Sequence, residues 1–354
     1  MPKYAVIDLG SNSVRLVVYE VEKPALDRCR RGARPVPKRD FRAVLDEKKM
    51  AGLSAYVSEG HFSQAGVEKA ASVLTKHLTR AEYCGCDRVD VFATAVLRNA
   101  ENSTQAVADI QDRIGVAVRV LSAEDEAHLG FVGASCDSVF RDAQAQGGLQ
   151  ATNGVGSATG AQNADGFRNA ANVATQPTHA TLIDIGGGST ELTRICHGQD
   201  LDKISIPQGS VSSYAQFVET ILATPQEAAR IAQAFRDNLG SVPNLEAFRS
   251  PILYGIGGSV RACAKMIAAM DASPSAPKPR VLTRQDLCSI LDFAQNEPGR
   301  FAHTLIRAVP DRAHTLIPGT VILEALMDQL ESERIQICAY GLREGYLIER
   351  MMNM

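Results

Sequence analysis

A short glycine-rich turn with a preceding aspartate occurs twice in the sequence and is the feature best suited to chemistry. The first copy follows Asp8, the second follows Asp184, and each lies between two β-rich apolar runs. Such a turn lets backbone N–H groups approach an anion, and hydroxyl groups add donors. Two of them could bind neighbouring phosphate groups of a phosphoanhydride from both sides. The turn residues are Gly10, Ser11, Asn12 and Ser13 in the first copy, and Gly186, Gly187, Gly188, Ser189 and Thr190 in the second.

Carboxylates beside these turns could hold a divalent cation. Asp8 and Asp184 end the apolar runs that precede the turns, and an aspartate at such a position binds a cation directly or through water. Glu191 follows the second turn, where it could bind metal or lie on an exposed strand face. The candidate metal ligands are therefore Asp8, Asp184 and Glu191.

A third glycine-rich turn could bind phosphate in the same way, but it leads into a helix rather than a strand. Gly257, Gly258 and Ser259 follow the apolar run PILYGI and precede the helical segment VRACAKMIAAM. The N–H groups at the start of a helix suit an anion, so these residues are candidate phosphate ligands. A tight packing turn is the alternative that the sequence leaves open.

An acid cluster lies where a predicted strand becomes a helix. Ser122 is a suitable N-cap, and Asp125 completes a variant capping box. Capping and the helix dipole account for Glu124 and Asp125, but they do not require Glu126. A carboxylate at the junction of two lobes could deprotonate water for in-line attack on phosphorus. Glu126 is therefore the candidate general base.

A single arginine is the candidate cation for the reacting phosphate. Arg98 lies just beyond the β-rich segment 88–95. Its guanidinium could bind phosphate oxygens bidentately. The alternative is a surface arginine near the start of a helix.

The elements that must position these groups alternate between strand and helix. Strand patterns cover 4–20 (interrupted by the first turn), 88–95, 116–121, 180–195 (interrupted by the second) and 335–339. Helical patterns cover 61–83, 102–114, 225–238, 284–293, 321–330 and 343–352. This alternation predicts an α/β fold.

Two lobes and a flexible insertion are expected from the pattern along the chain. Residues 1–125 form the predicted N-terminal lobe, joined by a closing helix at 341–354, and residues 126–340 form the second lobe. Within the second lobe, 142–179 consists mainly of small and polar residues that cannot bury enough surface to offset the entropy of ordering. We predict a flexible insertion there and a second loop of little structure at 273–280.

Composition restricts the class of protein. The chain has 354 residues, of which 45% are hydrophobic and 22% charged, as in globular proteins of two domains. No signal peptide or membrane span is expected, and the eight scattered cysteines suit reduced thiols in the cytoplasm. The net charge of −3 argues against general binding of nucleic acid. The basic segment 28–42 is either a solvated loop or a patch that attracts polyphosphate or RNA.

Taken together, the segments resemble the exopolyphosphatase/guanosine pentaphosphate phosphohydrolase family. The resemblance covers nearly the whole chain outside 28–38 and 142–179. It is carried by IDLGSNSVRL, ATAVLRNAEN, VLSAEDEAHLGFVGA, LIDIGGGSTEL, YGIGGSVRA, DRAHTLIPGTVIL and AYGLREGYL, in this order. It implies an actin-like ATPase fold of two ribonuclease-H-like lobes with a cleft between them, and release of terminal phosphate that depends on Mg²⁺ (or Mn²⁺).

The resemblance also implies roles for single residues. Glu126 matches the catalytic base, and Asp184 and Glu191 match acids near the metal and the attacked phosphate. Arg98 matches a phosphate-binding arginine, and the two glycine turns match the two phosphate turns.

Two departures from the family pattern stand out. Members often carry arginine where this chain has His128, and we expect the histidine to weaken the contact with phosphate. Long members also have a C-terminal helical domain like that of HD hydrolases, which we do not expect here.

The predicted function is release of terminal orthophosphate from inorganic polyphosphate. Hydrolysis of guanosine pentaphosphate is the alternative, because it presents the same terminal anhydride. An actin-like kinase or ATPase and a sensor without turnover are two further alternatives. A homodimer is the expected assembly, although no residue pattern specifies it.

Overall fold

The computed structural model describes residues 1–138, 140, 179–271 and 278–353. Apart from His179, the predicted insertion at 142–179 lies outside the described residues, and the predicted loop at 273–280 is described only from 278 onward. In the described part of the chain, no helix is long and apolar enough to cross a membrane.

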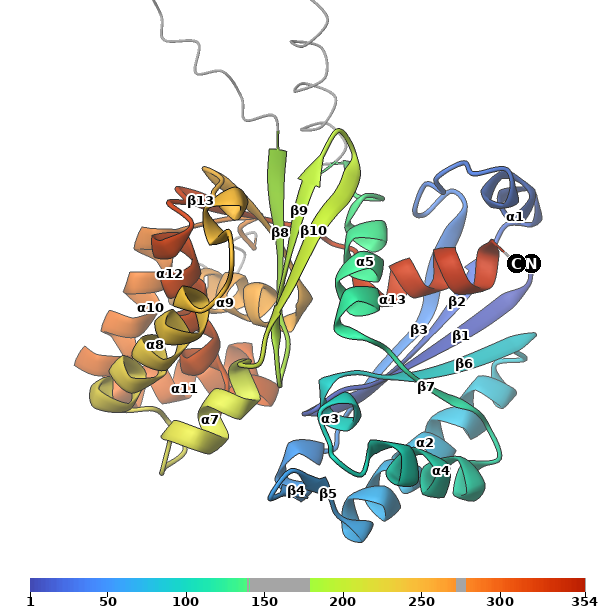
Figure 1. The fold of residues 1–354 in the computed structure, drawn as a ribbon, viewed down its shortest axis with the longest axis horizontal. Coiled ribbons are helices and arrows are strands. Elements are labelled where there is room, and N and C mark those ends of the chain that lie inside the picture. Colours follow the sequence, from blue (N-terminus) through green and yellow to red (C-terminus); the bar gives the residue numbers. More distant parts are fainter. Residues whose placement is uncertain (139, 141–178, 272–277, 354) are drawn as a thin grey trace, which may run out of the picture.

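Two mixed β-sheets, one in each lobe, repeat a single topology (Figure 1). The 5-stranded sheet has the order β3-β2-β1-β6-β7, and the 6-stranded sheet has the order β10-β9-β8-β11-β13-β12. In both, a central strand has antiparallel neighbours on one side and parallel neighbours on the other, and the second sheet adds β12, which pairs antiparallel with β13 at the edge. The strands of the first sheet are β1 (Lys3–Leu9), β2 (Ser13–Val21), β3 (Phe41–Met50), β6 (Arg88–Ala93) and β7 (Val118–Val120). Those of the second are β8 (His179–Ile185), β9 (Thr190–Cys196), β10 (Gln199–Ile206), β11 (Ile252–Ile256), β12 (Val281–Thr283) and β13 (Arg334–Ile337).

This repeated arrangement is the actin-like fold that the family resemblance implied, within the α/β class that the residue patterns predicted. Both copies begin with a central strand, and in β1 the side chains of Ala5, Val6 and Ile7 are fully buried. A strand covered on both faces is expected to be a continuous apolar run rather than an alternating one. The runs YAVID and ATLIDI therefore occupy the two sheet centres, and the aspartate of each run lies at the end of its strand.

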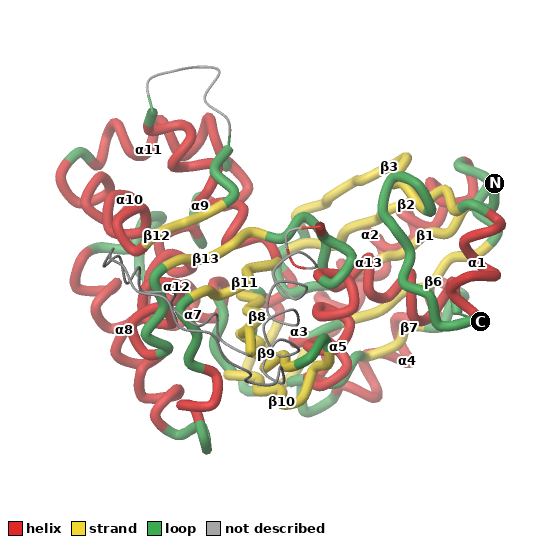
Figure 2. Tube along the Cα trace, turned by 90° about the horizontal axis from the view of Figure 1, so that it is seen from above, coloured by secondary structure: helices red, strands yellow, loops and turns green. Residues whose placement is uncertain are grey.

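Helices cover the sheets, and every helix predicted from the sequence is present with small shifts at its ends. In the N-terminal lobe they are α1 (Lys23–Arg30), α2 (Gln64–Tyr83), α3 (Ala95–Arg98), α4 (Ser103–Ile114) and α5 (Ala123–Ala134), with the short η1 (Leu53–Tyr56) and the strand pair β4 (Val57–Ser58) and β5 (His61–Phe62). The second lobe contains α7 (Ser210–Phe217), α8 (Pro225–Gly240), η2 (Leu245–Phe248), α9 (Gly257–Met270), α10 (Arg284–Asn296), α11 (Pro298–Ala308), η3 (Pro310–Arg312) and α12 (Leu316–Gln329). Figure 2 shows α8, α10, α11 and α12 gathered in this lobe.

Helix α8 shows how local sequence specifies these elements. Thr224 caps it, and the side chain of Glu227 accepts a hydrogen bond from the N–H of Thr224 at 2.7 Å, which completes a capping box. Along the helix, Ile231, Phe235 and Leu239 recur every four residues and are buried in the core of the second lobe.

The chain passes between the lobes twice. Helix α5 follows β7 of the first sheet and contacts β9 and β10 of the second. After β13 the chain returns as α13 (Leu342–Tyr346) and a π-helical turn (Leu347–Met352), which pack on the first sheet. At the crossing of α5 and this C-terminal segment, a Cβ on Gly133 would overlap the carbonyl of Gly341, so the two backbones are in direct contact.

The basic segment 28–42 differs from the predicted loop. Its first residues end helix α1, and its last begin strand β3. Arg28 and Arg39 bind the buried carboxylate of Asp40, at 2.6 and 2.8 Å. Part of the apparent basic patch is therefore neutralised inside the fold. Strand β3 was not predicted because it lies at the sheet edge and carries polar residues on both faces.

Candidate active site

The two glycine turns have the same local geometry. In the first, the N–H of Gly10 donates to the carbonyl of Ser13 at 3.1 Å. In the second, the N–H of Gly186 donates to the carbonyl of Ser189 at 2.9 Å. Each turn joins the central strand of its sheet to an antiparallel neighbour. The repeat in the sequence is thus a repeat in the structure, with one copy in each lobe.

Neighbouring elements bind carbonyl groups of both turns. The N–H of Ser54 in η1 donates to the carbonyl of Ser11 at 2.9 Å. The N–H of Val211 in α7 donates to the carbonyl of Gly187 at 2.8 Å. A turn whose carbonyl oxygens accept bonds from the protein presents less negative potential to an approaching anion. Both turns are therefore braced in a way that suits phosphate.

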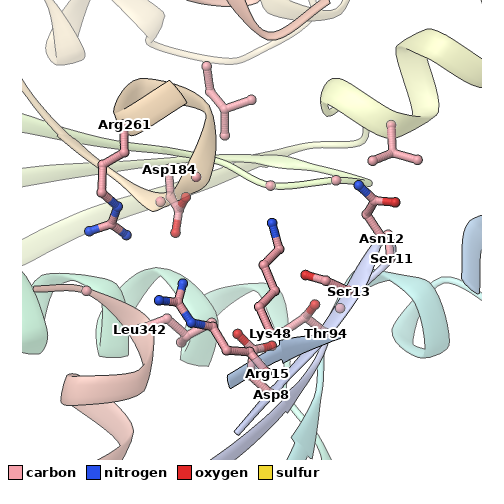
Figure 3. Close-up of a pocket in the computed structure, with 18 of the residues that line it drawn as sticks. Asp8, Ser11, Asn12, Ser13, Arg15, Lys48, Thr94, Asp184, Arg261 and Leu342 are labelled. Carbon is pink, nitrogen blue, oxygen red and sulfur yellow. The ribbon is translucent and has the colours of Figure 1, made fainter. Parts of the chain in front are cut away.

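The turns face each other across the two lobes. A Cβ on Gly187 would lie 2.9 Å from the Cβ of Ser11, and one on Gly188 would lie 3.2 Å from the Oγ of Ser11. Only glycine permits this approach. A cavity of about 370 Å³ lies beside the contact, and both turns, Asp8, Asp184 and Glu126 line it. Figure 3 shows Asp8 and Asp184 on opposite walls.

Glu126 and Arg98 form a buried ion pair at the junction of the lobes. The Oγ of Ser122 accepts a hydrogen bond from the N–H of Asp125 at 3.0 Å, so the predicted cap starts α5 and places Glu126 in its first turn. The Nη1 of Arg98 lies 2.5 Å from the Oε2 of Glu126, and its Nη2 lies 3.4 Å from the Oγ of Ser189. The Arg98 side chain is only 15% exposed, which excludes the alternative of a surface arginine.

Burial changes the proton affinity of both glutamates at this junction. It raises the pKa of Glu126 to about 7, against the opposing effect of Arg98. Burial and the nearby Glu126 also raise the pKa of Glu191 well above its usual range. A carboxylate with a pKa near neutrality is suited to take a proton from water and release it again.

Glu191 lies beneath the cavity rather than in its wall. It is buried, so the alternative of an exposed strand face is wrong. Its Oε1 accepts a hydrogen bond from Ser205 at 3.1 Å and lies 3.8 Å from the Nη2 of Arg98, whereas its Oε2 has no partner among the described residues. Neither Glu191 nor Arg98 is among the residues that line the cavity, and both lie next to Glu126, which does line it.

The residues present fit a metal that is held mainly by substrate. Within the described residues, no group of three or more His, Cys, Asp or Glu side chains forms a metal site of its own. Asp8 and Asp184 nevertheless line the cavity from opposite lobes. Mg²⁺ typically binds one or two carboxylates and completes its shell with phosphate oxygens and water. Of the predicted ligands, Asp184 and Asp8 line the cavity, with Oδ2 of Asp8 accepting a hydrogen bond from Arg343 at 2.8 Å, while Glu191 is not among the lining residues.

The third turn contributes backbone rather than a hydroxyl group. Gly257 has φ +84°, and a Cβ there would overlap Oδ1 of Asp184, so only glycine lets α9 begin against that carboxylate. The hydroxyl of Ser259 donates to the carbonyl of Ile185 at 3.0 Å. Thr190 likewise donates to the carbonyl of Gln208 at 2.7 Å. Neither hydroxyl is turned into the cavity.

A set of cations in the cavity wall was missed by the reasoning from sequence. These are Arg15, Lys48, Arg261, Lys265, Arg312 and Arg343. Four of them lie inside segments that carry the family resemblance, so those segments contained the signal, but Lys48 and Lys265 lie in none. Figure 3 shows Arg15, Lys48 and Arg261 among the side chains of this wall.

One of these cations joins the two lobes. Lys48 on β3 forms an ion pair with Asp311 in η3, across the cavity. Burial lowers the pKa of Lys48, and the nearby cation Arg312 lowers it further. The cavity wall therefore contains positive charge that Asp311 offsets only in part.

His128 has a different environment from the one expected. It does not line the cavity and so cannot weaken a phosphate contact there. Instead, its two ring nitrogens lie 2.7 Å from Asp200 and 2.8 Å from Glu349.

Known proteins resemble this chain over nearly its whole length. A model of the Ppx/GppA phosphatase family matches residues 34–145 and 165–354. The chain is 26% identical to Exopolyphosphatase 1 of Mycobacterium tuberculosis over 358 residues, which cover 99% of this chain and 88% of that protein. Among solved structures, an exopolyphosphatase from Cytophaga hutchinsonii aligns with a TM-score of 0.70 at 17% identity, covering 99% of this chain and 98% of that one. The Ppx/GppA enzyme of Aquifex aeolicus aligns with a TM-score of 0.65 at 21% identity, covering 98% and 99%.

Proposed function

The chain belongs to the Ppx/GppA phosphatase family, and we propose on that premise that it is an exopolyphosphatase-type phosphohydrolase. Its reaction is the release of terminal orthophosphate from inorganic polyphosphate. The observation that carries the proposal is the position of Glu126, a buried carboxylate of raised pKa in the wall of a cavity that two phosphate-type turns share.

The residues suggest a division of labour during hydrolysis. The turns of the two lobes hold neighbouring phosphoryl groups, and Arg98 offsets charge on the terminal one. Glu126 takes a proton from the attacking water, whose oxygen bonds to phosphorus as the bond to the bridging oxygen breaks. The shortened polyphosphate chain leaves with the former bridging oxygen. Asp8 and Asp184 are the residues that would hold Mg²⁺ or Mn²⁺, which would neutralise charge on the phosphate oxygens.

The cavity wall favours an inorganic chain over a nucleotide. None of the described residues that line it is aromatic, and so the wall offers no ring on which a guanine base could stack. It offers instead cations of both lobes, although three of them are paired with carboxylates of the same wall: Arg15 with Asp46, Lys48 with Asp311 and Arg343 with Asp8. A chain of phosphoryl groups carries charge along its whole length and can interact with several cations at once. We therefore place polyphosphate first and guanosine pentaphosphate second.

A phosphate-release assay tests the proposal. The substrates are short and long polyphosphate, guanosine pentaphosphate and ATP, each with Mg²⁺, with Mn²⁺ and with a chelator. We expect release from polyphosphate with either metal and none with the chelator. Release from guanosine pentaphosphate alone would replace the proposed substrate, and tight binding without turnover would make the protein a sensor.

Assembly and location stay predictions from the sequence. We propose a homodimer, which light scattering of the purified chain tests. We also propose a cytoplasmic location, which fractionation of cells that express the chain tests.

A further inference from the structure

His128 is bonded on both sides by carboxylates from different parts of the fold. Its Nδ1 lies 2.7 Å from the Oδ2 of Asp200 on β10, in the second lobe. Its Nε2 lies 2.8 Å from the Oε2 of Glu349, in the π-helical turn that packs on the first sheet. One imidazole on α5 thus connects elements of both lobes.

This geometry requires a positive charge on the ring. A neutral imidazole has a single N–H group, so it can donate to only one of two carboxylates. An imidazolium donates to both. The hydrogen bond to Glu349 raises the pKa of His128 to about 9, with Asp200 in support and burial in opposition. The same bond lowers the pKa of Glu349.

Other charged groups around the ring fix the same turn of α5. On β10, Lys203 lies 3.0 Å from Asp200 and 3.9 Å from Glu124. On the C-terminal turn, Arg350 donates to Asp125 at 2.9 Å. The first turns of α5 are therefore held by ionic bonds from β10 on one side and from the C-terminal turn on the other.

Glu126 lies in this same stretch of helix, but its side chain faces the cavity. We infer that His128 is a positioning residue. As a cation bonded to both lobes, it fixes the start of α5 and so holds the carboxylate of Glu126 next to the position of the attacking water. The inference rests on the proposed function, because it assigns Glu126 the role of base.

Two substitutions at this position separate charge from mere structure. His128→Gln removes the charge, and His128→Arg keeps it. We expect His128→Gln to lower kcat by about 10-fold to 10²-fold with little change in KM, because a small displacement of a catalytic group is costly. We expect His128→Arg to retain most of kcat. His303→Gln, on the exposed face of α11, is the matched control and should behave as wild type.

The pH profile of kcat is the readout that a purely structural role would not move. In the wild type, His128 loses its proton as the pH rises through about 9, so kcat should fall there. In His128→Arg the charge persists, so this alkaline fall should move to higher pH. Unchanged kcat in His128→Gln, or equal loss in both variants while circular dichroism shows both folded, would overturn the inference.

A second measurement does not depend on turnover. Nitrogen-15 NMR of the histidine rings, with the His128 signal assigned by its loss in His128→Arg, gives the protonation state of the ring directly. We expect an imidazolium at pH 8, and a neutral ring at that pH would overturn the inference. If the wild type releases no phosphate from any substrate, the proposed function is wrong. The NMR measurement alone then tests whether His128 is a cation bonded to Asp200 and Glu349.

Discussion

Glu126 and Arg98 share one buried ion pair, so the charge of each sets the behaviour of the other. Burial raises the pKa of Glu126 to about 7, which makes its carboxylate a stronger base than an exposed one. The guanidinium of Arg98 opposes this rise by favouring the charged carboxylate. Proton transfer to Glu126 would remove the negative charge that Arg98 faces at 2.5 Å, while Glu191 stays 3.8 Å from the same guanidinium. We therefore expect proton transfer to Glu126 to strengthen the attraction between Arg98 and a phosphate in the cavity.

Replacing Glu126 with glutamine should lower kcat by at least about 10²-fold, because a general base contributes on that scale. Binding of polyphosphate should be retained, since the turns and cations are untouched. Glu82→Gln is the matched control, because that side chain is exposed on α2, away from α5 and outside the cavity wall. Full activity in Glu126→Gln, measured by phosphate release at saturating substrate, would refute the assignment of the base.

The raised pKa of Glu126 also predicts how stability changes with pH. Its ordinary pKa is 4.5, and the folded value is about 7, so the folded state binds more protons than the unfolded state between these values. Its contribution to the free energy of unfolding is full below pH 4.5 and is lost as the pH rises through 7. Urea unfolding at pH 5 and pH 8 should show Glu126→Gln losing less stability than wild type across this window, by roughly 1–3 kcal/mol. An equal loss in both proteins would contradict the shift.

At this scale, the sequence was informative where a residue lies in a local pattern. The turns, Asp8, Asp184 and the capped start of α5 could all be predicted from neighbours in the chain. Lys48 and its partner Asp311 could not, because their contact depends on how two separately folded lobes meet. The bonds of His128 depend on the same placement.

Glycine residues lie where α5 crosses the C-terminal segment. Besides Gly133 at Gly341, a Cβ on Gly345 would overlap the carbonyl of Leu129. The helices approach this closely because no side chain separates them. The later half of α5 is thus positioned by backbone contact, and its first turns, with Glu126, are held by charge.

Gly133→Ala should destabilise the fold by about 1–3 kcal/mol, because the added methyl group must displace a backbone. Gly240→Ala is a suitable control, since Gly240 also lies in a helix but has open space around its Cβ position. Urea unfolding of both variants measures the difference. Equal stability of the two would show that the crossing can relax without cost.

Elements with one buried face could be predicted from their periodicity, and those at edges could not. Helix α8 has its cap and its apolar spacing in the sequence, so its position was predicted closely. Strand β3 has neither alternation nor an apolar run, because solvent covers much of both faces. Its pairing with β2 supplies what its own sequence lacks.

The two lobes of the whole molecule meet around charge. Lys48 and Asp311 pair across the cavity, so a polyanion that enters must compete with Asp311 for the ammonium group. Coulombic competition of this kind is screened by salt. A polyphosphate chain carries more negative charge than a single phosphate, so we expect it to displace Asp311 from Lys48 more easily.

Asp311→Asn should lower KM for polyphosphate several-fold at low ionic strength, and Lys48→Gln should raise it, with smaller effects at high salt. Asp202→Asn is the control, because it changes the net charge equally at a residue outside the cavity wall. Phosphate release against substrate concentration, at two salt concentrations, measures these shifts. If Asp311→Asn raises KM instead, Asp311 assists binding rather than competing with the substrate.

The duplicated topology was the largest feature that the sequence predicted, because the two aspartate-glycine turns mark equivalent places in two sheets. The way the lobes are joined has a consequence for their relative movement. The two connections between the lobes, α5 and the segment before α13, touch each other, because no side chain separates Gly133 from Gly341. We therefore expect the lobes to move apart by rotation about this contact, with the glycine turns separating while the connections stay together.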